Sequence, residues 1–171
     1  MTRPPDLFRY LLVRYAIIPF FVNIVVNFAI GMLVFHGQES VATWAADGGA
    51  VADSIGTCFF LPFITCLIVS PIVRYELHQG VADRISPRIS PRWVRRMSGQ
   101  LMIRAAKFGL MGVLLLAGPV CSLYCLFAGE SIETVRFIAI KAISSGLLGF
   151  CVTPVIAFVA MCDQPDSPQP R

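Results

Sequence analysis

The sequence predicts an all-α integral membrane protein, a four-helix bundle that keeps both chain ends in the cytoplasm. Apolar residues make up 56% of the 171-residue chain and charged residues only 14%, whereas soluble domains carry about a quarter charged residues. Mean hydropathy is +0.72. The charges lie between long apolar runs, and the basic residues fall almost entirely on one side of the runs. These observations together indicate a membrane protein of defined topology.

Four segments are apolar for long enough to cross about 30 Å of hydrocarbon, which takes about 20 residues of helix. They are Leu11–Phe35, Val51–Val73, Ala105–Phe127 and Val135–Met161. The first is longer than the apolar core of a cleaved signal peptide, which has about 7–15 residues. We therefore expect a retained first span.

The basic residues orient these spans. All of them except Arg136 and Lys141 lie near the N-terminus, between Arg74 and Lys107, or at the C-terminus, while the acidic residues show no such bias. Basic residues resist translocation, whereas acidic residues contribute little to topology. The pattern predicts that both termini and the central loop are cytoplasmic.

We expect one membrane domain made of two helical hairpins. Residues 1–80 form the first hairpin, 81–104 a basic loop, 105–162 the second hairpin and 163–171 a disordered tail. The hairpins look duplicated, because Glu39-Ser40-Val41 aligns with Glu130-Ser131-Ile132 and one inserted residue then superposes Pro62 on Pro154. A tandem repeat of this kind is parallel, with its axis along the membrane normal.

The basic loop contains the stretch RISPRISPRWVRR, in which apolar residues interleave with arginines. This pattern suits a segment that lies on anionic headgroups, and helix is expected to resume near Pro91 and run toward the third span. A single loop with one Trp offers no module for reading nucleic acid. The predicted contacts with anionic phospholipids are Arg84, Arg88, Arg92, Trp93, Arg95 and Arg96.

Asn23 and Asn27, one helical turn apart, are the strongest polar signal within the spans. Asn23 lies at the centre of its segment, where an unpaired amide would cost several kcal/mol. Two interpretations stay open. The pair bonds between helices, with Thr65 or Thr153 as partner, or it lines a path for a substrate or ion.

Asp53 and Lys141 fall near the outer ends of the second and fourth spans. One interpretation is an ion pair that closes the outer mouth of the bundle or forms part of a gate. The other treats them separately, with Asp53 as a helix N-cap and Lys141 extending its side chain toward the interface. Both interpretations stay open.

Enzyme chemistry finds no support in the sequence. The two histidines, His36 and His78, are predicted on opposite sides of the membrane, so they cannot share a metal or a proton relay. No nucleotide-binding loop or nucleophile motif is present. We expect no cofactor and no metal.

The stretch VNIVVNFAIG, then Trp44, then LPFITCLIVSPIVR resembles uncharacterised small bacterial inner-membrane proteins built from two-helix hairpins. The resemblance covers about Phe20–Arg74. It implies an architecture and a bacterial inner membrane, but no activity. The sequence favours a non-catalytic structural or accessory module that binds lipids and partner helices. The alternative is a small transporter or channel that acts as an oligomer. Expected partners are a second copy of the chain or another membrane protein.

Overall fold

The computed structural model describes residues 7–46, 48–81, 91–97 and 99–163, with the backbone alone at 95, 125 and 127. Its elements in chain order are α1 (Leu7–Leu12), a π-helix (Val13–Ile17), α2 (Ile18–Val34), β1 (Ser40–Ala42), α3 (Ala50–His78), α4 (Arg92–Met97), α5 (Leu101–Phe127), β2 (Ser131–Glu133) and α6 (Thr134–Cys162).

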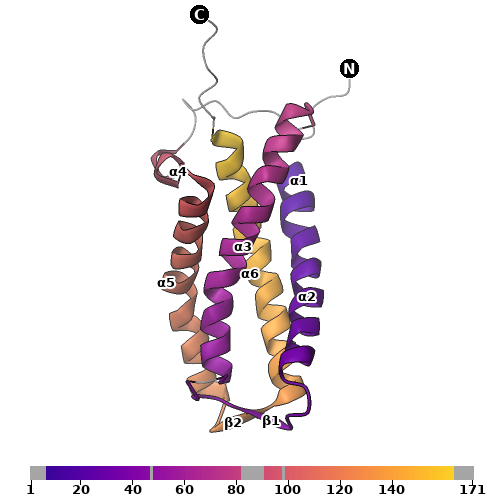
Figure 1. Ribbon diagram of the computed structural model, residues 1–171, viewed down its shortest axis with the longest axis vertical. Helices are drawn as coiled ribbons and strands as arrows, with labels where there is room; N and C mark the ends of the chain where they lie inside the picture. Colours follow the sequence, from indigo (N-terminus) through magenta and orange to yellow (C-terminus); the bar gives the residue numbers. More distant parts are fainter. Residues whose placement is uncertain (1–6, 47, 82–90, 98, 164–171) are drawn as a thin grey trace, which may run out of the picture.

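Four helical stretches are long and apolar enough to cross a membrane, as the sequence predicted. They are Leu7–Val34, Ala50–His78, Leu101–Tyr124 and Thr134–Cys162. All four run along one axis, with β1 and β2 at one end, here called the strand end (Figure 1). The opposite end, where α1 begins and α6 ends, is called the terminal end. Three of the helices extend about one turn further toward the terminal end than predicted.

The long helices pack in the order α5, α3, α6, α2, with α3 and α6 in the middle (Figure 1). Close approach depends on glycine. A Cβ on Gly112 of α5 would lie 2.2 Å from the Cys58 carbonyl oxygen of α3, and one on Gly149 of α6 would lie 2.2 Å from the Asn23 amide nitrogen of α2. Small residues of this kind let apolar helices pack through van der Waals contact.

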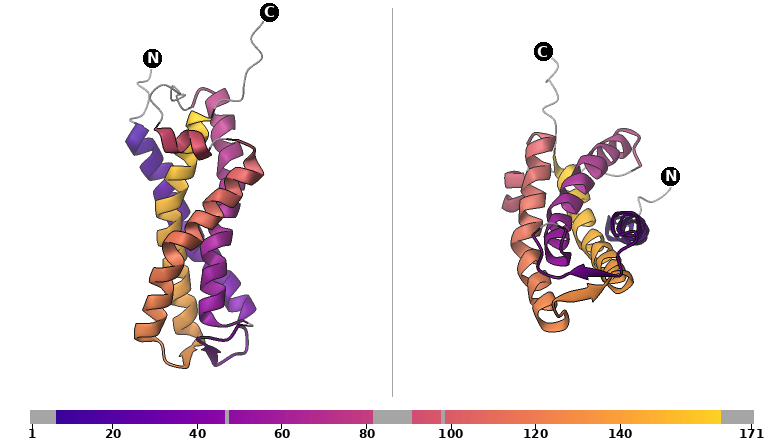
Figure 2. Two further views of the ribbon diagram at one scale, coloured as in Figure 1. Left: turned by 90° about the vertical axis from the view of Figure 1, so that its left-hand side faces the viewer. Right: turned by 60° about the horizontal axis from the view of Figure 1, so that its bottom comes forward.

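Two short strands, which the sequence did not predict, tie the hairpins together at the strand end. β1 and β2 pair antiparallel, with Val41 opposite Ile132 (Figure 2). The pairing continues outward, because the Thr43 amide donates to the Glu130 carbonyl and the Thr134 amide to the Glu39 carbonyl. Val41 and Ile132 are both buried and belong to a small apolar core at this end.

The terminal end holds a second, larger core and the short helix α4. Val94 of α4 is buried in that core, together with Val73 and Phe108. Helix resumes directly after Pro91, as expected, but it does not continue without a break into the third span. α4 ends at Met97 and α5 begins at Leu101, because Gly99 adopts a φ of 136° that a helix does not allow.

Candidate functional site

The predicted charge pair between Asp53 and Lys141 is present, at the strand end. Lys141 Nζ of α6 donates a 2.8 Å hydrogen bond to Asp53 Oδ1 of α3 and lies 2.6 Å from Oδ2. Only 6% of the Lys141 side chain and 22% of the Asp53 side chain are exposed. The lysine therefore does not extend to the surface, and its charge is balanced within the protein.

Asp53 is not the N-cap of its helix. That position belongs to Gly49, whose carbonyl accepts a hydrogen bond from the Asp53 amide. Asp53 lies in the first turn of α3, where its negative charge also suits the positive end of the helix dipole. Its carboxylate is free to face α6, which is why the ion pair forms.

A cavity of about 730 Å³ begins beside this pair. Its floor is α3, with Ser54 and Cys58, and its walls are α5 and α6. The hydroxyls of Ser54 and Tyr124 lie 3.0 Å apart in the part of the cavity nearest the strand end, while most of the remaining lining is apolar. The lining also includes Lys141 and, one turn further along α6, Ser145.

The contacts predicted for the two asparagines need correction. Asn23 donates to the Pro19 carbonyl at 2.8 Å, and Asn27 donates to the Asn23 carbonyl at 3.0 Å, so both bonds stay within α2. Thr65 lies on α3, whereas α2 packs against α6. Thr153 is fully buried, and its hydroxyl has no hydrogen-bond partner among the described residues. The helix's own carbonyls compete successfully for side-chain donors at this spacing.

A buried carboxylate at the terminal end was not singled out from the sequence. Glu76 of α3 is 4% exposed and accepts hydrogen bonds from the hydroxyls of Tyr10 and Tyr15, the latter at 2.6 Å. Arg14 forms an ion pair with its other oxygen. The sequence does contain a signal for this cluster. Tyr10 and Arg14 are one helical turn apart on the first span, and Glu76 lies at the same end of the second span.

The π-helix explains how both tyrosines reach one carboxylate. Tyr10 and Tyr15 are five residues apart, a spacing that an α-helix would place on different faces. A π-helix forms hydrogen bonds between residues five apart, so the two rings meet with their centroids at 5.6 Å. The widened turn, Val13–Ile17, therefore directs both hydroxyls at Glu76.

A second charge cluster closes the same end. Asp163, directly after α6, accepts hydrogen bonds from Arg104 of α5 at 2.7 Å and from Arg74 of α3 at 2.8 Å. The Arg104 side chain is fully buried, and its Nε and Nη2 atoms have no partner among the described residues. The sequence placed Arg104 in the cytoplasmic loop, because hydropathy does not show that α5 begins earlier, at Leu101.

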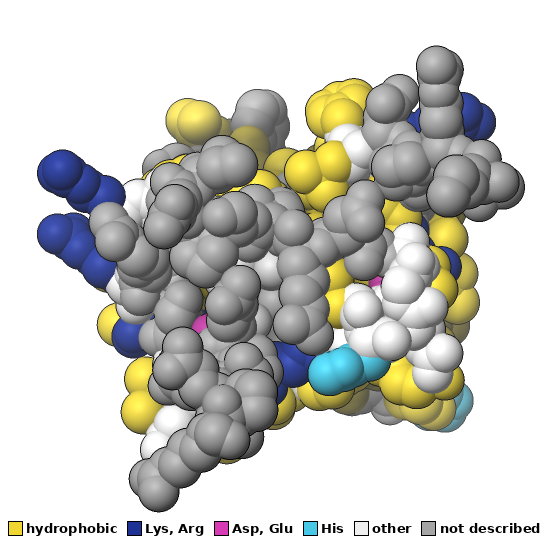
Figure 3. All heavy atoms as spheres, turned by 90° about the horizontal axis from the view of Figure 1, so that it is seen from above, with side chains coloured by type: hydrophobic (Ala, Val, Ile, Leu, Met, Phe, Trp, Pro, Cys, Tyr) yellow, Lys and Arg dark blue, Asp and Glu magenta, His cyan; other side chains and the backbone are white. Residues whose placement is uncertain are grey.

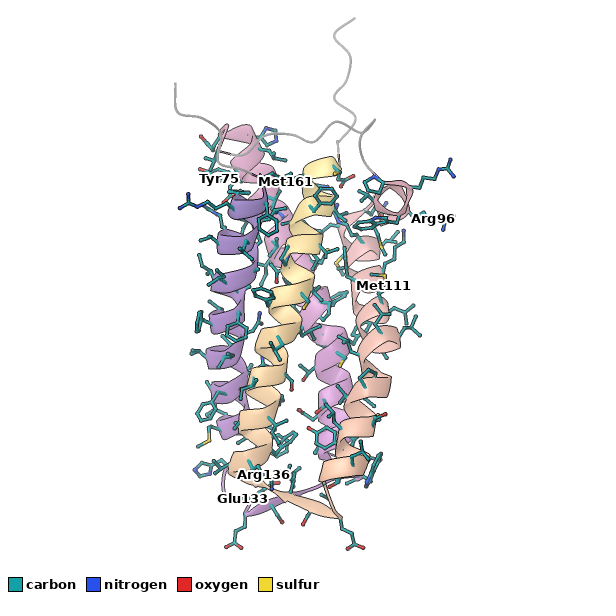
Figure 4. All side chains as sticks on the ribbon, turned by 180° about the vertical axis from the view of Figure 1, so that it is seen from behind. Tyr75, Arg96, Met111, Glu133, Arg136 and Met161 are labelled. Carbon is teal, nitrogen blue, oxygen red and sulfur yellow. The ribbon has the colours of Figure 1, made fainter. Side chains whose placement is uncertain are left out.

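Only some of the residues predicted to contact lipid are among the described residues. Arg92 and Arg96 are exposed on α4, and Arg96 projects away from the bundle (Figure 4). The Trp93 ring lies 6.4 Å from that of Phe158 on α6. Arg84 and Arg88 lie outside the described residues, as does the Arg95 side chain.

The described residues thus form three clusters. The ion pair beside the cavity lies at the strand end, and two buried charge clusters lie at the terminal end. Seen from that end, Lys and Arg side chains stand out at the rim of the molecule (Figure 3). No group of three His, Cys, Asp or Glu residues in the described ranges is placed to hold a metal ion. In comparisons with known proteins, no family model, curated protein or solved structure matches this chain.

Proposed function

We propose that this chain is a non-catalytic module of a bacterial cytoplasmic membrane, which binds anionic phospholipid at its terminal end and packs against partner helices in the bilayer. The terminal end is cytoplasmic in this proposal. The observation that carries it is α4: exposed Arg92 and Arg96 flank a Trp93 that packs on Phe158 of α6. Cations beside an interfacial aromatic ring suit a surface of negative headgroups.

The strand pairing supports the parallel repeat within this proposal. Val41 and Ile132 are equivalent in the repeat alignment, and they stand opposite each other in the sheet. In an antiparallel pair, such a match is what a two-fold axis between the halves produces. The helix packing agrees with such an axis. The repeat makes α2 equivalent to α5 and α3 equivalent to α6, and the contact of α5 with α3 is matched by the contact of α2 with α6. Both hairpins would then enter the membrane from the same side.

The histidines and asparagines favour a module over an enzyme or a transporter. His36 follows α2 at the strand end, whereas His78 ends α3 at the terminal end. Asn23 and Asn27 use their amide donors on carbonyls of their own helix. A path lined by these amides therefore has no geometric support here.

Lipid retention tests the proposal. The full chain, extracted in a mild detergent and examined by native mass spectrometry, should retain phosphatidylglycerol or cardiolipin. The double variant Arg92→Gln and Arg96→Gln should lose most of it, whereas Arg92→Lys and Arg96→Lys keep the charge and should keep the lipid. Equal retention in the glutamine variant would contradict the proposal.

Topology is tested separately. Cysteine substitutions at exposed Gly129, at the strand end, and at exposed Gln79, at the terminal end, should react with a membrane-impermeant maleimide from opposite sides. The six native cysteines of the chain require the unsubstituted protein as background. Labelling of Gln79→Cys in intact cells would overturn the proposed orientation.

A further inference from the structure

The cavity between α5 and α6 is open along its length. Lining residues on both walls are exposed, among them Leu115 and Leu123 of α5 and Leu147 and Val155 of α6. In a bilayer, this side of the protein faces lipid tails instead of water. A ligand that enters here therefore comes from the membrane and has an apolar part.

The two ends of the cavity differ in chemistry. Hydroxyl groups gather near the strand end, on Ser54, Thr57 and Tyr124. The opposite part is lined by apolar side chains, including Phe108, Met111, Val152 and Val155. The distance from Lys141 to Val155 along α6 is about 21 Å at 1.5 Å per residue. The cavity thus has room for one extended chain with a polar head at the strand-end side.

Two buried donors mark where that head would lie. Lys141 and Ser145 are one turn apart on the same face of α6, both line the cavity, and they are 7% and 1% exposed. The Ser145 hydroxyl has no partner among the described residues. An ammonium carries three donors, and the two oxygens of Asp53 cannot occupy all of them.

The charge around this head position is positive. The described lining includes two cations, Lys141 and Arg136, and no carboxylate. Asp53, just outside the lining, neutralises one of these cations. One positive charge remains, and a ligand with a single negative charge would balance it. Arg136 lies at the strand end of α6 (Figure 4) and is part of the lining.

From this geometry we infer that the cavity is a binding site for a long-chain fatty acid. Its carboxylate accepts hydrogen bonds from Lys141 and Ser145, and its chain runs between α5 and α6 toward Phe108 and Val155. The site uses side chains that the proposed contacts of α4 do not involve. The inference depends on the proposed membrane insertion and not on lipid binding at the terminal end.

Photo-crosslinking tests the site in the full chain. The protein is placed in nanodiscs of zwitterionic phosphatidylcholine and labelled with a fatty acid that carries a diazirine near its methyl end. Labelled peptides should come from α5 near Phe108 and from α6 near Val155. Labels concentrated at the strand end, near Arg136, would overturn the inferred orientation and with it the site.

A pair of tryptophan variants tests whether the chain occupies the cavity. Leu148→Trp fills it from α6, while Ile143→Trp places the same ring on an exposed part of α6 outside the lining. Labelling should fall about tenfold in Leu148→Trp and stay unchanged in Ile143→Trp. Size-exclusion profiles confirm that both variants fold. Equal labelling of the two folded variants would overturn the inference.

The head group is tested by competition. Oleate should displace the label, and methyl oleate, which lacks the negative charge, should do so only at much higher concentration. In Ser145→Ala, the oleate concentration needed should rise about tenfold, because one hydrogen bond to a charged group is lost. Equal competition by the methyl ester, or an unchanged oleate requirement in Ser145→Ala, would exclude an anionic head at this position. A tightly held diacyl phospholipid that oleate cannot displace would also exclude the fatty acid.

Discussion

The ion pair between Asp53 and Lys141 allows a quantitative test of the structure. The Lys141 ammonium lies 2.6 and 2.8 Å from the two oxygens of the Asp53 carboxylate. The two side chains differ in exposure, at 6% for Lys141 and 22% for Asp53. The two single substitutions should therefore have unequal effects on the free energy of unfolding.

Asp53→Asn leaves a buried ammonium without a counter-ion, which destabilises proteins by about 3–5 kcal/mol. Lys141→Met leaves a carboxylate that water still reaches, so the loss should be about 2–3 kcal/mol. The double variant removes both charges, so its loss in free energy of unfolding should be smaller than the sum of the two single losses. The expected coupling energy between the two positions is about 2–3 kcal/mol.

Unfolding by sodium dodecyl sulfate in mixed micelles, followed by circular dichroism, gives the four free energies of the cycle. Glu39→Gln, which neutralises an exposed carboxylate at the same end, should change stability by less than about 0.5 kcal/mol. Additive losses in the double variant would mean that the pair does not form. A larger loss for Lys141→Met than for Asp53→Asn would contradict the exposures on which the reasoning depends.

Two further substitutions test the helix contacts. Gly112→Ala places a Cβ 2.2 Å from the Cys58 carbonyl oxygen and should reduce the free energy of unfolding by about 1–3 kcal/mol; Gly118→Ala, with nothing within 4 Å, is its matched control and should be neutral. Tyr15→Phe removes a donor from the buried Glu76 carboxylate and should reduce the same free energy by about 1–3 kcal/mol. A neutral Gly112→Ala in thermal denaturation, or a Tyr15→Phe as stable as the wild type, would contradict these contacts.

Hydropathy alone identified the four long helices, because apolar length is a property of each segment and does not depend on its neighbours. The strand pair was beyond such reasoning. Three residues are too few to show an alternating pattern, and β1 gains its hydrogen bonds only where β2, more than 80 residues later, lies beside it. A contact of this range leaves no mark in the sequence of either strand taken by itself.

The polar residues show a similar division. The sequence identified Asp53 and Lys141 as one candidate pair, and the structure brings them together. It identified Asn23 as a polar residue within the first span but did not identify its hydrogen-bond acceptor. An asparagine amide can donate either to a distant hydroxyl or to the carbonyl four residues earlier in its own helix, and the sequence does not distinguish the two. Glu76 was overlooked, because its three partners come from a helix more than 60 residues away.

The π-helix at Val13–Ile17 has a consequence for how the first span can change. An α-helix turns by about 100° per residue, so deleting one residue from the widened turn would leave Tyr10 and Tyr15 four residues apart, on one face of a uniform helix. Both hydroxyls would still point toward Glu76, and the contact of α2 with α6 would keep its alignment. The widened turn can thus lose one codon without redirecting Leu7–Leu12, whereas a codon lost within α2 would rotate everything before it by about 100°.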